Sequence, residues 1–288
     1  MRVFRGTDAV ARGLVTRKQL RSSAWRRLRQ DVYADASLPV THRLLVDAAG
    51  MALPPGAGFT GLSAALLWGV PDIATAADPV EVILPPGARW HPGNGIVVRR
   101  TKSVLRLERV RRWPCTSRVD TAVGLIRRGD PDETVVLLDR LLAGGLTTPM
   151  DVRDAVAVLP PGRGSAQARR VADLADAYAQ SPQETRLRLL LLSGGLPAPV
   201  TQFRVFDDVG FVARLDLAYP ELRIAIEYDG LWHAESRAFL ADRRRLNRLQ
   251  AAGWVVVHVT VEDLRDPGRL LAHLRALLAQ RRALINAR

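Results

Sequence analysis

The chain has 288 residues, of which 48% are hydrophobic, enough apolar material for two or three packed domains. Its formal net charge of +13 favours a polyanionic partner such as nucleic acid. Of its 42 basic residues only Lys18 and Lys102 are lysine, and such an excess of arginine is also typical of a GC-rich genome. The single Cys115 excludes an intramolecular disulfide and a multi-cysteine zinc site.

The sequence shows no signal for export or membrane insertion. The N-terminal residues contain no apolar core of a signal peptide, and no run of about 18 uncharged apolar residues occurs. We therefore expect a cytoplasmic protein with no membrane partner.

Residues 1–40 predict a small basic module. Thr16 is a plausible helix N-cap, Ser22 and Ser23 precede an expected helix over 24–29, and a short strand over 31–34 follows. Helix, turn, helix and strand is the order of a winged helix-turn-helix, which suits DNA. A charged solvated helix is the alternative. The candidate nucleic-acid contacts are Arg17, Lys18, Arg26, Arg27 and Arg29.

Residues 41–160 predict a central α/β region without a catalytic constellation. Expected helices cover 42–49, 61–69, 118–128 and 131–143, and expected strands cover 80–84 and 95–100. Seven basic residues and one acid, Glu108, fall within 99–112, which is either an extension of a DNA surface or a solvated edge.

The N-terminal half resembles AbiEi-type regulators, the antitoxin side of abortive-infection toxin–antitoxin pairs. The matching stretches are Leu14 to Leu20, Val32-Tyr33, Ser63 to Gly69 and Pro114 to Ala122. The resemblance implies a winged helix that binds operator DNA, and a toxin-like protein partner. The residue before Val32 is Asp31, where that family usually has glycine.

Residues 178–288, after a Pro/Gly-rich linker at 160–165, predict a further domain. Ser181, Pro182 and Glu184 are typical of a helix start, so Glu184 has a sufficient explanation as the acid of a capping box. Strands, a basic helix over 235–252, a buried strand and a last helix follow. The expected order is αβββαβα.

Two expected strands of this domain, 211–218 and 222–228, carry acids where buried strands should carry none. An ionised carboxylate there is costly unless it is paired or holds a cation. If the strands pair as a hairpin, Asp216 and Glu227 come close, and a divalent metal would relieve their repulsion. The alternative is an ion pair of Asp216 with Arg214 or Arg244. We interpret His258 and His273 as structural.

This domain resembles the PD-(D/E)XK nuclease superfamily, in particular the Vsr-like endonucleases and a related uncharacterised domain family. The matching stretches are Ser181 to Glu184, Arg214 to Pro220, Ile226 to Gly230 with His233, Asp242 to Arg245, and Gly253-Trp254. The resemblance implies a restriction-endonuclease-like fold and a Mg²⁺ or Mn²⁺ site with Asp216, Glu227 and Asp229 as ligands. His233 would be general base or water-orienting group, Arg245 would stabilise phosphate charge, and Glu184 could reach the site.

One position departs from that superfamily. Its pattern places lysine two residues after the acid, and here that position is Asp229. No lysine follows Lys102, so His233 or an arginine must take the role, or it stays empty. Arginine is a poor proton shuttle because its pKa exceeds about 12.

We therefore expect a multi-domain α/β protein with a winged helix, a central α/β region and a nuclease-like domain. The first functional hypothesis is a metal-dependent DNA endonuclease. The second is a DNA-binding regulator of the antitoxin type whose nuclease-like domain is catalytically idle. Cleavage of RNA is a third hypothesis that the sequence leaves open.

Overall fold

The computed structural model describes residues 3–101, 104–229 and 236–287, with side chains in the last range from 242 onward. Within these ranges the chain is a mixed α/β protein with three sheets. It divides into two compact units: the first is Met1–Gly129 with Gly144–Asp173, and the second is Asp130–Ala143 with Leu174–Arg288. No helix in the described part of the chain is long and apolar enough to cross a membrane.

The first unit begins with a three-stranded antiparallel sheet in the order β1-β3-β2. Its strands are β1 (Val3–Arg5), β2 (Trp25–Arg29) and β3 (Val32–Asp35), and α1 (Gly6–Ala11) and the short 3₁₀ helix η1 (Gln19–Arg21) lie between β1 and β2.

The helix expected over 24–29 is wrong, because these residues form strand β2. Trp25 packs edge-on against Phe4, with ring centroids 5.0 Å apart, and Arg27 pairs across the sheet with Tyr33. Cross-strand aromatic packing of this kind outweighs the helix propensity of the arginines. The module therefore lacks the recognition helix of the expected winged helix-turn-helix.

The rest of the first unit is a five-stranded sheet with helices, in the strand order β6-β5-β4-β8-β7. Strands β6 and β7 form opposite edges, so the basic residues of 99–112 divide over both edges instead of forming one patch. The elements are α2 (His42–Gly50), β4 (Gly58–Phe59), α3 (Gly61–Trp68), β5 (Val80–Leu84), β6 (Ile96–Arg100), β7 (Leu107–Val110), β8 (Trp113–Thr116), α4 (Arg118–Ile126), α6 (Pro149–Ala157) and α7 (Ser165–Leu174).

The second unit contains a four-stranded sheet in the order β12-β11-β10-β9, antiparallel except for the parallel pair β11 and β12. From α8 onward the order is αβββαβα with one extra short helix, α10, before the last, as the sequence predicted apart from that addition. The elements are α5 (Pro131–Ala143), α8 (Pro182–Ser193), β9 (Val200–Asp207), β10 (Gly210–Tyr219), the 3₁₀ helix η2 (Pro220–Leu222), β11 (Ile224–Tyr228), α9 (Ser236–Ala251), β12 (Val255–Val259), α10 (Val261–Arg265) and α11 (Gly268–Asn286).

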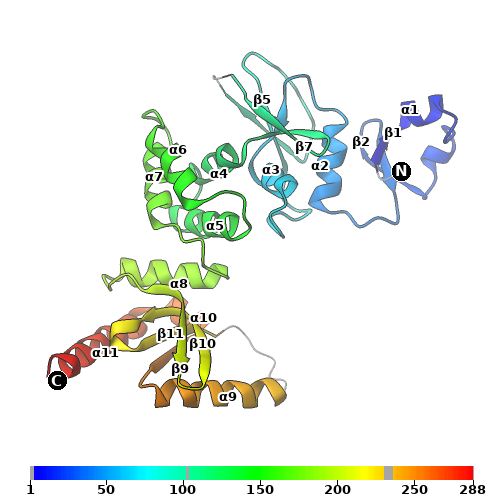
Figure 1. Ribbon diagram of the computed structural model, residues 1–288. Helices are drawn as coiled ribbons and strands as arrows, with labels where there is room; N and C mark the ends of the chain where they lie inside the picture. The colour runs from blue at the N-terminus through cyan, green and yellow to red at the C-terminus, as the bar shows by residue number, and fades with distance from the viewer. Residues whose placement is uncertain (1–2, 102–103, 230–235, 288) are drawn as a thin grey trace. The chain divides into compact units, whose positions relative to one another are not determined.

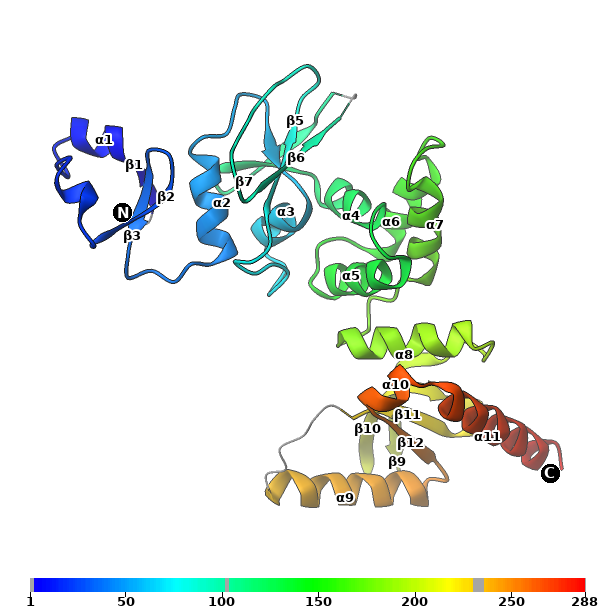
Figure 2. The ribbon, with the colours of Figure 1, turned by 180° about the vertical axis from the view of Figure 1, so that it is seen from behind.

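Helices cover both faces of this sheet. Helices α8 and α11 lie on one face and α9 lies on the other (Figures 1 and 2). Leu187 of α8 and Leu274 of α11 belong to the first apolar cluster, and Leu249 of α9 belongs to the second. The sheet is therefore buried on two sides, and polar side chains within it need an explanation.

The alternation of side chains between the two faces of the sheet is interrupted in β10 at Asp216. Leu215 packs in the α9-side cluster and Leu217 in the cluster of α8 and α11, although residues two apart in a regular strand share a face. The pairs Leu215↔Phe203 and Leu217↔Thr201 place Gln202 of β9 opposite Asp216, and Gln202 has the positive φ of 51°. Both strands are thus irregular at this one point.

Candidate active site in the second unit

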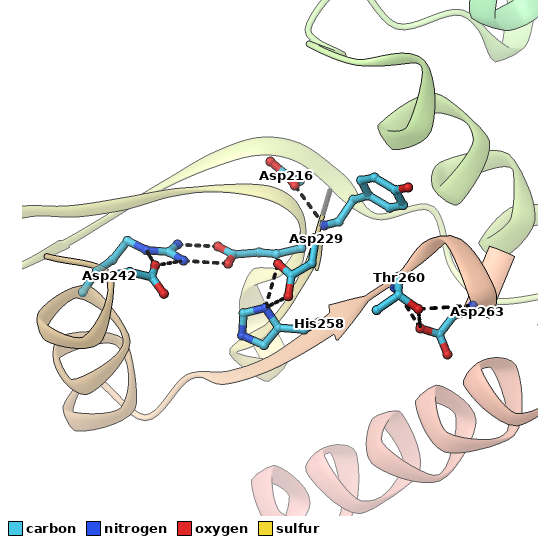
Figure 3. Close-up of polar contacts among 9 residues, drawn as sticks. Asp216, Asp229, Asp242, His258, Thr260 and Asp263 are labelled. Atoms are coloured by element: carbon cyan, nitrogen blue, oxygen red, sulfur yellow. Dashed lines mark hydrogen bonds and ion pairs between the residues drawn. The ribbon is translucent and has the colours of Figure 1, made fainter. Parts of the chain in front are cut away.

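Asp216 lies in the middle of the sheet with one identified hydrogen bond. Its Oδ2 accepts from the backbone N–H of Tyr228 at 3.1 Å, on the neighbouring strand β11 (Figure 3). Burial raises the pKa of Asp216 to about 6; the Tyr228 N–H opposes that shift, and the nearby charges of Glu184 and Glu227 add to it. The structure thus gathers three of the carboxylates that the sequence singled out.

Glu227 is 7% exposed and is paired with an arginine from another element. Arg245 of α9 donates Nη1 to Oε1 at 2.6 Å and Nη2 to Oε2 at 2.9 Å, a fork that engages both carboxylate oxygens. Arg245 also donates to Asp242 Oδ1 from Nε at 3.0 Å. The hydrogen bond to Glu227 raises the pKa of Arg245, so the guanidinium stays charged.

Asp229 follows the end of β11 and pairs with His258, which the sequence analysis interpreted as structural. Its Oδ1 lies 3.1 Å from Nδ1 of His258, and both side chains are partly exposed (Figure 3). Parallel pairing sets His258 of β12 directly beside Glu227. Only the strand register reveals this neighbour, because the two residues are separated by a whole strand–helix–strand crossover.

Glu184, 8% exposed, enters the site from the first turn of α8. Its backbone N–H receives the Ser181 cap, as the sequence predicted, while its Oε2 accepts from the backbone N–H of Gln180 at 2.9 Å and from Nε2 of Gln202 at 2.9 Å. The expected capping box is therefore not formed, because the Glu184 carboxylate accepts from the N–H of Gln180 and not from that of the N-cap Ser181, and Glu184 contributes charge beside Asp216. Gln202 was not identified from the sequence.

The donor set fits a hard divalent cation. Among the described residues no group of three or more His, Cys, Asp and Glu side chains converges as a metal site. Mg²⁺ needs fewer, since it keeps several waters and is usually held by one or two carboxylates. Asp216 has an oxygen with no hydrogen-bond donor among those residues, and Glu227 adds a second carboxylate once Arg245 releases it. The Oε1 of Gln202 is a buried acceptor for which the described part of the chain supplies no hydrogen-bond donor.

His233, expected as general base, lies outside the described residues. Arg245 and Asp242 reach the site together on α9, whereas Asp229 turns its carboxylate to His258. Asp216, Glu227 and Glu184 form the acidic centre, and Asp229 with His258 forms a separate pair at its side.

The expected nucleic-acid contacts of the first unit divide into two groups. Arg26 donates to the carbonyls of Ala36 and Leu38, and Arg29 donates to those of Pro92 and Asn94, so both hold the fold together. Arg17, Lys18 and Arg27 are exposed. The tertiary structure thus leaves three of the five residues at the surface for a polyanion.

The sequence of the chain is similar to those of two mycobacterial proteins. No protein-family model matches it. The uncharacterized proteins MT2308 and Rv2248 of two Mycobacterium tuberculosis strains are each 34% identical over 194 residues, which cover 67% of this chain and 71% of each relative. The crystal structure of the RV2827C protein from M. tuberculosis matches with a TM-score of 0.41 and 15% identity, over 72% of this chain and 84% of that one.

Proposed function

The chain belongs to the same family as the uncharacterized M. tuberculosis proteins Rv2248 and MT2308, and we propose that it is a metal-dependent endonuclease that hydrolyses phosphodiester bonds in DNA. The observation that carries the proposal is the buried carboxyl of Asp216. Its pKa is raised to about 6 by burial, with Glu184 and Glu227 nearby. Acids gathered in this way within a sheet core are typical of a cation site.

The chain's own residues would divide the work of hydrolysis. Asp216 and Glu227 would hold Mg²⁺ or Mn²⁺, and Asp242 would keep Arg245 near the site when the guanidinium leaves Glu227. A bound divalent cation supplies Lewis-acid polarisation of the phosphodiester and lowers the pKa of a water. Arg245 would then face the phosphate and stabilise its negative charge.

Proton transfer needs a different side chain, because arginine stays protonated. His258 is held at Nδ1 by Asp229, and its ring stands beside Glu227 in the sheet. Histidine is the side chain that most often serves as a general base, so this pair can take the place of the missing lysine. His233, which the resemblance favours, remains a second candidate.

The charge supports a nucleic acid as the substrate, and we propose DNA. The chain carries +13, and its exposed basic residues include Arg17, Lys18 and Arg27 of the first unit. Backbone phosphates dominate the affinity of such surfaces for nucleic acid. A toxin-like protein partner remains a proposal from the resemblance of the N-terminal half.

The test is cleavage of supercoiled plasmid by the full chain with Mg²⁺ or Mn²⁺. We expect nicking that EDTA abolishes and that Asp216→Asn lowers by at least about a hundredfold, since a metal contributes several kcal/mol to such a transition state. Asp208→Asn, an exposed acid of the same unit, is the matched control and should cut normally. RNA of the same sequence tests the third hypothesis.

A regulator with an idle domain is the second candidate, favoured by one observation. The Arg245 fork already neutralises Glu227 without a metal. If supercoiled, linear, mismatched and single-stranded DNA all stay uncut while DNA still binds, the nuclease proposal is wrong and the regulator stands.

A further inference from the structure

Gln202 occupies an unusual place in β9. The strand pairs on either side of it, Leu215↔Phe203 and Leu217↔Thr201, set it opposite Asp216. Neighbouring strands lie about 5 Å apart, so side chains that leave two such strands at this irregular point can share a ligand. Neither charge nor a sequence motif marks this residue.

The hydrogen bond to Glu184 fixes which way the amide of Gln202 is oriented. Its nitrogen Nε2 must face Glu184 Oε2, 2.9 Å away, because a carboxylate only accepts. The oxygen Oε1 is therefore the free end, and it is buried with no hydrogen-bond partner among the residues that the structure describes. Leaving a buried acceptor unpaired costs free energy, so an unpaired oxygen at this point requires an explanation.

The backbone of Gln202 is unusual as well. Its φ of 51° lies in the left-handed region that non-glycine residues rarely enter, within an otherwise extended strand. Strain of this kind persists where the surrounding structure enforces it, and it concentrates at functional sites. The buried unpaired oxygen and the strained backbone thus coincide in one residue beside Asp216.

We propose that Gln202 is a further oxygen ligand of the divalent-cation site, its Oε1 binding the cation together with Asp216. This inference rests on the proposed function, because it concerns the same cation. An amide oxygen is a hard ligand of the type that Mg²⁺ and Mn²⁺ accept. Being neutral, it adds a ligand without more repulsion among Asp216, Glu227 and Glu184, while its Nε2 keeps Glu184 in position.

Titration of the full-length chain with Mn²⁺, followed by calorimetry, tests this assignment. We expect Gln202→Leu to weaken the Kd for Mn²⁺ about tenfold or more, within the range for removal of groups around a metal. Gln202→Glu keeps an oxygen at that position and should bind Mn²⁺ at least as tightly as the wild type. The matched control, Gln180→Leu, removes an exposed side-chain amide but retains the backbone N–H that Glu184 accepts, and it should leave the Kd unchanged.

The rise in melting temperature on adding Mn²⁺ provides a second measurement. A ligand role predicts that this rise shrinks in Gln202→Leu. A lower melting temperature without metal, combined with an unchanged Kd, would show that Gln202 is structural only. Equal loss of affinity in the Leu and Glu variants would assign the effect to the anchoring of Glu184 and overturn the ligand role.

The variants separate this inference from the proposed function. If the wild type binds Mn²⁺, Asp216→Asn abolishes binding and Gln202→Leu binds normally, only the role of Gln202 is overturned. If the wild type binds neither Mn²⁺ nor Mg²⁺, the metal-dependent function fails and the role of Gln202 fails with it.

Discussion

At the scale of single residues, Asp216 is the centre of the candidate site. Asp216 was identified from the sequence because an acid in a buried strand is costly. The structure adds its environment: burial raises its pKa, and the two acids near it, Glu184 and Glu227, come from two other elements, α8 and β11. An acid within an apolar strand is a local signal, whereas burial and neighbouring acids depend on other elements. The sequence could therefore identify the residue but not its environment.

The raised pKa predicts how stability depends on pH. The native state holds the Asp216 proton with a pKa of about 6, above the ordinary value of 3.8, so it binds more protons than the unfolded chain between these values. The free energy of unfolding that Asp216 contributes therefore falls as pH rises from about 4 to about 6.

Asp216→Asn removes this titration and should be more stable than the wild type at neutral pH, by on the order of 1–2 kcal/mol after solvent screening. The two proteins should converge near pH 4. Urea unfolding at several pH values without metal measures the difference. A constant difference across this range would contradict the raised pKa of Asp216.

His258 and Gln202 are the residues that sequence reasoning missed. His258 was interpreted as structural because it stands in an apolar strand, yet it contacts Asp229 at 3.1 Å. Gln202 is a neutral side chain on an edge strand. Both owe their place to strand pairing, and pairing partners are not encoded by any local pattern.

Arg245 is the main contribution of helix α9 to the site. The sequence offered Arg214 or Arg244 as an ion partner of Asp216, but no such ion pair occurs among the described residues, and Arg214 donates to Gln180. Instead Arg245 reaches Glu227, while Arg248 pairs with Asp207 at the β9–β10 turn. Two ion pairs thus fix α9 against the sheet.

Arg245→Met leaves Glu227, 7% exposed, without its cation. We expect a loss of about 2–3 kcal/mol in the free energy of unfolding, below the value for fully buried pairs because Arg245 is partly exposed. Added Mn²⁺ should recover much of it by taking the place of the guanidinium. Denaturant unfolding with and without Mn²⁺ measures both effects.

Arg244→Met, at an exposed neighbouring position, is the control and should change stability by less than about 0.5 kcal/mol. A Mn²⁺-induced stabilisation no larger in Arg245→Met than in the wild type would show that Arg245 and the cation do not compete for Glu227.

The strand β2 is the element that the sequence predicted wrongly. Ser22, Ser23 and a run of arginines indicate a helix start, but Trp25 is held by Phe4 and the strand pairs with β3. Phe4 lies about twenty residues before Trp25 in the chain, whereas β3 follows β2 directly as the second strand of a hairpin. Intrinsic propensity is a weak prior against such packing.

At the scale of the molecule, the second unit includes residues 130–143, which lie in the sequence between the two segments of the first unit. Helix α5 belongs with the second unit, and its Asp139, 1% exposed, pairs with Arg188 of α8 at 2.8 Å. Asp139 also accepts from Thr185 Oγ1 and from the backbone N–H of Asp176. A domain boundary drawn at 178 from sequence composition leaves this helix out.

This predicts that residues 130–288 fold independently better than residues 174–288. Without α5 the guanidinium of Arg188, 7% exposed in the whole chain, has no carboxylate partner, and we expect the shorter fragment to be less stable by at least about 3–5 kcal/mol. Thermal unfolding of the two fragments measures this.

Replacing Arg188 by Met should restore part of the stability of the shorter fragment, because the unpaired buried charge is removed. In the longer fragment the same substitution should destabilise, since Asp139 then loses its cation. Equal stability of the two unsubstituted fragments would show that α5 is not an integral part of the second unit.

The sequence by itself determined the order of elements in residues 178–288 apart from α10, the Ser181 cap of α8 and the presence of acids in buried strands, because periodicity, caps and misplaced charges are local signals. Only the tertiary structure decided that 25–29 is a strand, that α5 joins the second unit, that Arg245 neutralises Glu227 and that Gln202 and Asp216 stand on paired strands between the same two residue pairs. Each of these depends on contacts between residues far apart in the chain, and the free energy of such contacts exceeds local preference only once the chain is folded.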